Sequence, residues 1–133
     1  MLGRGLFIAA CLVMTNALSN PLAAAPFKIE EASIADVHRA MSNGQMTARQ
    51  LVQAYLKRID AYDKKGPAIN AIIQINPKAL EEADRLDAAF QKKGLTGPLH
   101  GIPILVKDAI ATIDMPTTGG SLSLQGFVPK NEA

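Results

Sequence analysis

The apolar run Ile102–Val106 constrains the fold most, because it leads directly into a charged residue, Lys107. A nearly continuous apolar segment of this kind is typical of a strand that is buried on both faces, as in α/β proteins. A lysine at the end of a buried strand is costly, since desolvation disfavours its charged form. We therefore expect Lys107 either to pair with an acidic group or to lose its proton and act as a base.

Three segments upstream of this run have the pattern of amphipathic helices, with apolar side chains at helical spacing behind an N-cap residue. The predicted helices begin at the N-caps Ser33, Thr47 and Asn76 and end near Asn43, Tyr62 and Gly94. The isoleucine-rich stretch Ile69–Ile75 favours a strand. The predicted order is two helices, then strand, helix and strand, which indicates α/β layering. Two strands alone do not make a stable sheet, so we expect them to pair with strands encoded downstream or the chain to be a fragment.

The first 25 residues have the order of features expected of a secretory signal peptide. Arg4 is followed by the apolar run Leu6–Met14 and then by small residues that end at Ala23–Ala25. The run is too short to span a bilayer, which takes about 20 apolar residues, so we expect no stable membrane insertion after the signal is removed. The predicted product is exported to the periplasm or secreted. A lipid anchor on Cys11 is an alternative, but that cysteine also reads as a small apolar residue of the leader.

The charge pattern argues against a nucleic-acid-binding protein. The net charge is +2, the basic residues are spread along the chain, and tryptophan is absent. Such proteins usually carry a basic stripe and aromatic platforms for base stacking, and neither is present.

Two motifs lie around the lysine: GPLHGIPILVKD at 97–108 and MPTTGGS at 115–121. In this combination they resemble the amidase signature family, and the chain is most similar to its secreted, peptide-amidase-like members. The resemblance implies an α/β fold in which helices cover a mixed sheet. It also implies that residues 26–133 are the N-terminal, incomplete part of an amidase domain, with no cofactor and no metal.

The resemblance implies a mechanism with a Ser–cis-Ser–Lys triad in which Lys107 is the base. Its neutral amine takes a proton, through the cis-serine, from the nucleophilic serine, which attacks an amide carbonyl. The substrate would be a small-molecule or peptide carboxamide. Both serines are expected downstream of Ala133, so we expect the chain alone to be inactive.

Other readings of the site residues stay open at this stage. Lys107 could instead pair with Asp108 or Asp114, although strand neighbours point to opposite faces. His100 is expected to be a structural hydrogen-bonding residue, and His100, Asp108 and Asp114 have no recognisable metal-ligand spacing. The residues expected to line a substrate cleft, or only to shape a turn, are Thr117, Thr118 and Gly119.

Two further functions remain as alternatives. The chain could be a truncated, non-catalytic remnant or an interaction module. It could also be a subunit of the amidotransferase type, although the predicted leader argues against this because tRNA-linked amidotransferases are cytosolic. The oligomeric state does not follow from the sequence.

Overall fold

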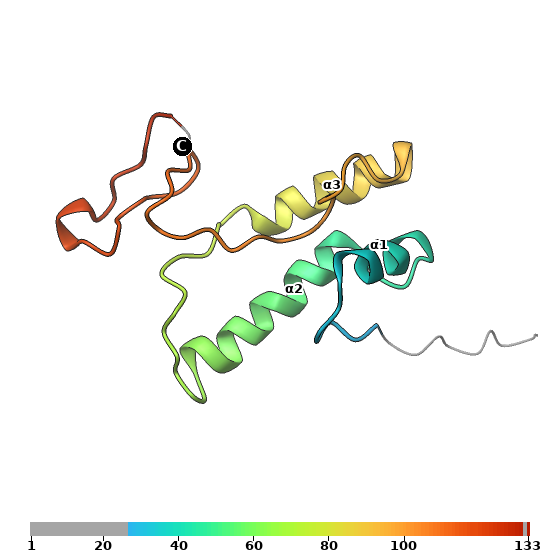
Figure 1. Cartoon of the computed structure of the whole chain (residues 1–133), viewed down its shortest axis with the longest axis horizontal. Coiled ribbons are helices and arrows are strands. Elements are labelled where there is room, and N and C mark those ends of the chain that lie inside the picture. Colours follow the sequence, from blue (N-terminus) through green and yellow to red (C-terminus); the bar gives the residue numbers. More distant parts are fainter. Residues whose placement is uncertain (1–26, 132) are drawn as a thin grey trace, which may run out of the picture.

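The computed structural model describes residues 27–131 and 133, so the predicted leader 1–25 lies outside the described residues. The described part contains three α-helices joined by irregular segments (Figure 1). They are α1 (Ile34–Ser42), α2 (Ala48–Arg58) and α3 (Ala79–Lys93). A π-helical turn, Ile59–Lys64, continues α2, and a 3-10 turn spans Leu122–Leu124. No helix in the described part of the chain is long and apolar enough to cross a membrane.

The starts of α1 and α2 confirm the prediction from capping boxes. The Ser33 hydroxyl accepts a hydrogen bond from the Asp36 N–H at 3.2 Å, and the Asp36 carboxylate accepts one from the Ser33 N–H at 3.1 Å. Thr47 and Gln50 make the same reciprocal pair at the start of α2. Each box satisfies two backbone donors that helix geometry leaves free.

The predicted start of α3 is wrong by two residues. Asn76 does not cap the helix directly; its side-chain oxygen accepts from the Lys78 N–H at 2.8 Å, and its carbonyl accepts from the Ala79 N–H at 3.1 Å. The asparagine therefore closes a turn of its own before the helix begins, as short polar side chains often do. Gly94, with φ +72°, ends α3 as predicted.

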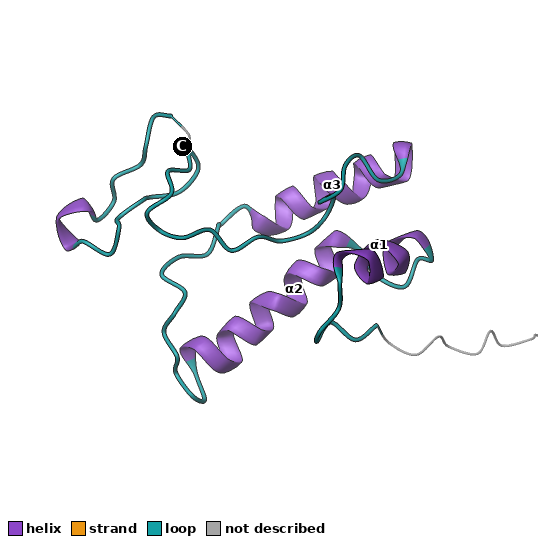
Figure 2. Cartoon of the chain, in the orientation of Figure 1, coloured by secondary structure: helices purple, strands orange, loops and turns teal. Residues whose placement is uncertain are grey.

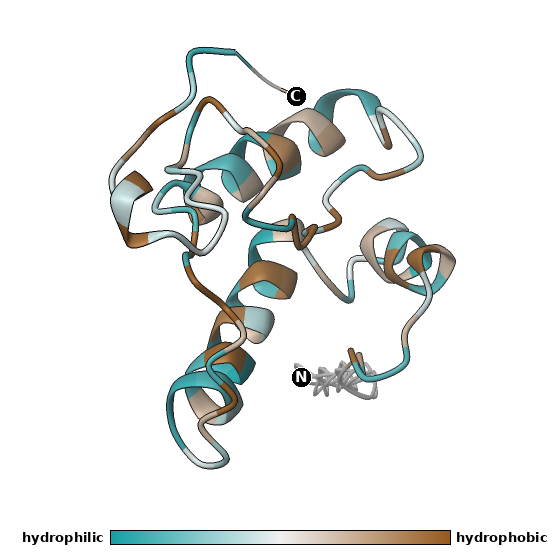
Figure 3. Cartoon of the chain, turned by 60° about the vertical axis from the view of Figure 1, so that its left-hand side comes forward, coloured by the Kyte–Doolittle hydropathy of each residue, from teal (hydrophilic) through white to brown (hydrophobic). Residues whose placement is uncertain are grey.

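A small hydrophobic core holds the three helices together. Its buried residues are Val37, Met41, Ala48, Leu51 and Ala83. Phe90 and Ile102 are partly buried against this cluster, so the segment that follows α3 also contacts the core. In Figure 1 this segment turns back from the end of α3 and runs along that helix. The apolar residues of the chain are not confined to the helices, and Figure 3 shows further hydrophobic stretches along the irregular segments.

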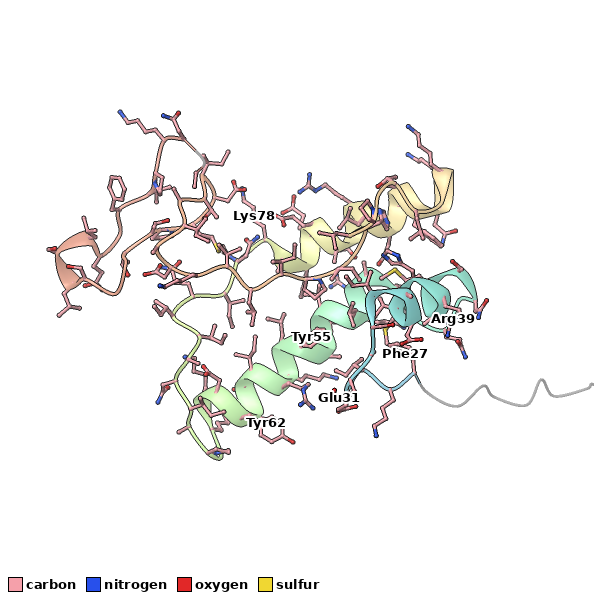
Figure 4. The ribbon with its side chains drawn as sticks, viewed as in Figure 1. Phe27, Glu31, Arg39, Tyr55, Tyr62 and Lys78 are labelled. Carbon is pink, nitrogen blue, oxygen red and sulfur yellow. The ribbon has the colours of Figure 1, made fainter. Side chains whose placement is uncertain are left out.

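The outer side of α2 is polar and aromatic. Figure 4 shows Tyr55 and Tyr62 along the helix and its continuation. The guanidinium carbon of Arg58 lies 5.3 Å from the centroid of the Tyr62 ring, and the Arg58 Nη1 lies 2.9 Å from a carboxylate oxygen of Glu30. Both contacts are at the surface, where cation–π and ion pairs each contribute about 1 kcal/mol or less.

The two predicted strands do not form in the structure, so the strand–helix–strand order is not confirmed. Residues 69–75 and 102–106 have irregular backbone, and Figure 2 shows no strand among the described residues. A strand is defined by its hydrogen bonds to a neighbouring strand, and neither stretch makes such paired bonds with another described segment. Ile73 and Leu105 are accordingly 60% and 80% exposed.

A buried carboxylate shapes the loop that follows α2. Asp63 accepts hydrogen bonds from the N–H groups of Ala71, at 2.6 Å, and Ile72, at 3.3 Å. The Lys64 ammonium lies 2.8 Å from its second oxygen. The hydrogen bond from Lys64, followed by those from the two N–H groups, holds the pKa of Asp63 below its usual value against the opposing effect of burial. Asp63 thus fixes the direction in which the chain enters residues 69–75.

Candidate active-site segment

The candidate site begins with His100, which anchors the GPLHGIP motif to the helices. Its side chain is buried, and its Nδ1 lies 2.8 Å from the Thr96 hydroxyl. Its ring faces that of Phe90, with the centroids 6.0 Å apart, and its carbonyl accepts a hydrogen bond from His38 Nε2 at 3.0 Å. Among the described residues its Nε2 has no hydrogen-bond partner. These contacts confirm the predicted structural role of His100.

Gly101 brings the motif against the core at a point where a Cβ would be crowded. Its φ is +72°, a left-handed conformation that residues with a Cβ rarely adopt. A Cβ at this position would lie 2.8 Å from Met41 Cε and 3.1 Å from Ala48 Cβ. The glycine therefore allows the backbone of the motif to touch α1 and the start of α2 directly.

Lys107 lies six residues after this anchor and is exposed. The residues that the structure describes therefore do not bury it. The three apolar residues before it, Ile104 to Val106, are between 45% and 80% exposed, because no described segment packs over them. Lys107 makes no ion pair with any described residue, so the expected alternative pairing with Asp108 or Asp114 is also not seen.

The neighbouring Asp108 is tied instead to the loop at 118–120. Its carboxylate accepts hydrogen bonds from the N–H groups of Thr118, at 3.2 Å, and Gly120, at 3.1 Å, and from the Thr118 hydroxyl. Its backbone carbonyl accepts from the Gly119 N–H at 3.2 Å. The Thr118 hydroxyl, followed by the backbone N–H groups, holds the pKa of Asp108 below its usual value, and desolvation opposes this effect.

The three predicted cleft residues lie in this same loop. Thr118 and Gly119 hold the turn through Asp108, and the Thr117 N–H donates to the Phe127 carbonyl at 2.9 Å. Thr118 and Gly120 also border an open hollow of about 380 Å³ that reaches Ile73. The loop therefore forms a turn and also provides one wall of the hollow.

Sequence reasoning missed Asp108 as the residue that organises the loop. The only signal was its position, beside the lysine and ahead of a Thr-Thr-Gly-Gly stretch that can offer several donors to one carboxylate. No three His, Cys, Asp or Glu side chains within residues 27–131 and 133 gather as metal ligands would.

Comparison with known proteins places these motifs in context. A family model described as "Amidase" matches residues 50–133. The chain is 36% identical over 132 residues to a probable amidase of Arabidopsis thaliana, covering 96% of this chain and 25% of the relative. It is 38% identical over 100 residues to a glutamyl-tRNA(Gln) amidotransferase subunit of Maridesulfovibrio salexigens, covering 74% and 20%.

The structure of the chain is also similar to that of a solved amidase. The native peptide amidase of Stenotrophomonas maltophilia superposes with a TM-score of 0.76 at 46% identity, over 81% of this chain and 22% of that chain. This likeness supports the α/β class that the sequence predicts. The chain spans a quarter or less of the length of the relatives and of the solved structure named above.

Proposed function

Because the chain belongs to the amidase family, we propose that it supplies the general base, Lys107, of an amide hydrolase with a Ser–cis-Ser–Lys triad. Residues 26–133 are then the N-terminal part of the amidase domain. The observation that carries the proposal is the anchored motif: His100 and Gly101 fix the backbone to α1 and α2 six residues before the lysine. A base must be held in place relative to its partner, and this contact to a packed core provides the fixed point.

The lysine acts as a base only in its neutral form. A serine hydroxyl is a weak nucleophile and needs a neighbouring base to take its proton. Lysine reaches a suitable pKa when apolar surroundings exclude water from it, and Ile104, Leu105 and Val106 are the residues of this chain that would contribute to such surroundings. We assign neither triad serine to this chain. Ser121 and Ser123 are exposed, and their hydroxyl groups are hydrogen-bonded to each other with 2.8 Å between the oxygens.

The proposed substrate is a carboxamide of a small molecule or a peptide, and the relation to peptide amidase favours a peptide amide. In this proposal Thr117, Thr118 and Gly119 line the substrate cleft, since the loop that carries them borders the hollow beside Ile73. The leader pattern of residues 1–25 supports export to the periplasm or secretion.

A segment exchange tests the assignment. Residues 27–133 replace the equivalent segment of the Stenotrophomonas maltophilia peptide amidase, and ammonia release from a peptide amide is measured. Lys107→Ala is expected to lower kcat/KM about 10²- to 10⁴-fold, the usual contribution of a general base. Lys92→Ala, which removes an exposed lysine at the end of α3, is the matched control. An active chimera that is indifferent to Lys107→Ala would contradict the proposal.

The amidotransferase alternative is not better supported. The similarity to amidotransferase subunits is real, but the identity to peptide amidase is higher, at 46% against 38%. The same chimera tests whether this segment works as part of a hydrolase. Release of free ammonia from a peptide amide supports the hydrolase. A chimera that folds like its parent and releases none supports either the amidotransferase or the non-catalytic alternative.

A further inference from the structure

We propose that Asp108 is a positioning residue for Lys107: its carboxylate ties the loop 118–120 to the backbone beside the lysine and so fixes where the amine is presented. The inference rests on the proposed role of Lys107 as a base and goes beyond it by naming the group that holds that base in place.

The tie is made by several hydrogen bonds between parts of the chain that are ten residues apart. Thr118 donates both its N–H and its hydroxyl to the carboxylate, and the Gly120 N–H donates to it as well. The Asp108 carbonyl accepts a fourth bond, from the Gly119 N–H. A carboxylate that accepts several bonds at once is held in one orientation, because hydrogen bonds to a charged group are roughly twice as strong as neutral ones.

The backbone that follows the lysine is also held in a turn. The Lys107 carbonyl accepts from the Ile110 N–H at 2.9 Å, which closes a turn over Asp108. Together with the anchor at Gly101, this turn leaves residues 102–106 as the stretch that joins two fixed points. The direction of the Lys107 side chain then depends on the geometry of the 107–110 turn and of the loop bonded to it.

The tie has an electrostatic consequence for the lysine as well. A carboxylate paired with an ammonium favours the charged form of the lysine, which cannot act as a base. Because the loop engages the Asp108 carboxylate, this acid is kept from pairing with its neighbour. The fold thereby places an acid next to the base in sequence without joining the two charges.

Variants of the segment-exchange enzyme test the inference. Asp108→Asn and Thr118→Val are each expected to lower kcat at least about 10-fold, because misplacing a reacting group by about 1 Å can cost 10²-fold. Asp108→Asn should do so with little change in KM. Thr118→Ser keeps the hydroxyl and is expected to restore most of the rate. Asp114→Asn removes an exposed carboxylate nearby that accepts no hydrogen bond from described residues, and serves as the control.

The pH profile gives a readout that a purely structural role would not move. In Thr118→Val the carboxylate loses its hydroxyl partner, so only the backbone N–H groups of Thr118 and Gly120 still hold it away from Lys107. The rise of kcat/KM with pH should then shift to higher pH, whereas neutral Asp108→Asn should not shift it this way. Wild-type kinetics and an unmoved profile in folded Asp108→Asn and Thr118→Val would overturn the inference, while loss of activity in Lys107→Ala alone would leave the proposed function standing.

The full 133-residue chain provides a second measurement that does not depend on activity. By NMR, the Thr118 and Gly120 amide protons are expected to exchange with solvent about 10-fold faster in Asp108→Asn, since a net hydrogen bond contributes about 1 kcal/mol or more. The Lys107 side-chain resonances should shift in the same variant. Unchanged exchange and unchanged Lys107 resonances would overturn the tie, whether or not the segment exchange yields a folded enzyme.

Discussion

The carboxylate of Asp87, in the middle of α3, accepts a hydrogen bond from the backbone N–H of Ala48, the first residue of α2, at 2.7 Å. Its second oxygen accepts from the Arg49 N–H at 3.0 Å. Thr47 satisfies the Gln50 N–H of the same turn. One helix therefore supplies the negative charge that the N-terminus of another favours, and the two helices are joined by more than apolar contact.

We expect Asp87→Ala to lower the free energy of unfolding by about 1–2 kcal/mol, the usual effect of removing a helix cap. Asp84→Ala is the matched control one turn away. Asp84 pairs with Arg49 at the surface, and such pairs contribute about 0–1 kcal/mol. Urea unfolding followed by circular dichroism measures both variants. Equal losses in the two would show that the Asp87 cap contributes nothing beyond a surface ion pair.

The contact of Gly101 with the core predicts a sharp difference between two glycines of one motif. Gly101→Ala should cost at least about 2 kcal/mol, because the left-handed backbone and the approach to Met41 and Ala48 are both unfavourable for a Cβ. Gly97→Ala has no atom within 4 Å of its new Cβ and should stay within about 0.5 kcal/mol of the parent. Thermal unfolding of the two variants compares them, and a similar melting temperature for both would refute the close contact.

Acid should weaken the fold through carboxylates whose pKa values are lowered in the folded state. Those of Asp36, Asp63 and Asp108 all lie below the ordinary value of 3.8. Their contribution to the free energy of unfolding is fully present above the unfolded-state pKa and is lost as the pH falls through the folded-state pKa. The free energy of unfolding should therefore decline below about pH 4.

Asp63→Asn should make this decline shallower, since the substitution removes one of these three carboxylates. Asp114→Asn, which removes an exposed carboxylate without hydrogen bonds to described residues, is the comparison variant. Denaturant unfolding at a series of pH values between about 2.5 and 7 gives the two slopes. An unchanged slope in Asp63→Asn would mean that its hydrogen bonds do not favour the ionised form.

The exposed apolar stretch before Lys107 should make the isolated chain associate. Ile104 and Leu105 are 64% and 80% exposed and adjacent in a segment of irregular backbone. An exposed apolar stretch of this kind is a typical site for unwanted strand pairing. Leu105→Lys should shift the population toward monomer in analytical ultracentrifugation, and Gln91→Lys on the exposed face of α3 is the control. A parent chain that sediments as a single monomer at all concentrations would contradict this expectation.

The helices could be predicted from the sequence because the interactions that start them are local. The side chains of Ser33 and Thr47 each accept a hydrogen bond from a residue three positions ahead, and each apolar stripe lies within a single helix. The strands could not be confirmed in the same way, because a strand depends on partners elsewhere in the chain. The predicted N-cap Asn76 was wrong for a related reason: an asparagine that can cap a helix can equally close a separate turn before it.

At the candidate site, too, local features could be predicted from the sequence and long-range contacts could not. The motif around Lys107 could be recognised because its residues are contiguous in the sequence. The structural role of His100 was predicted from its neighbours Leu99 and Gly101. The Asp87 cap joins residues 39 apart, and the Asp108 tie joins residues ten apart, so both depend on how the chain turns. The exposure of Lys107 also could not be read from its apolar neighbours, which predict burial only where another segment covers them.

The bond from His38 to the His100 carbonyl fixes a proton position. A carbonyl oxygen only accepts, so His38 Nε2 must carry the hydrogen, and the neutral ring is restricted to one tautomer. The charged ring carries a hydrogen on the same nitrogen and can donate equally well. The attachment of the GPLHGIP motif to α1 thus survives either charge state of this imidazole, and acidification that releases carboxylate contacts elsewhere leaves this hydrogen bond in place.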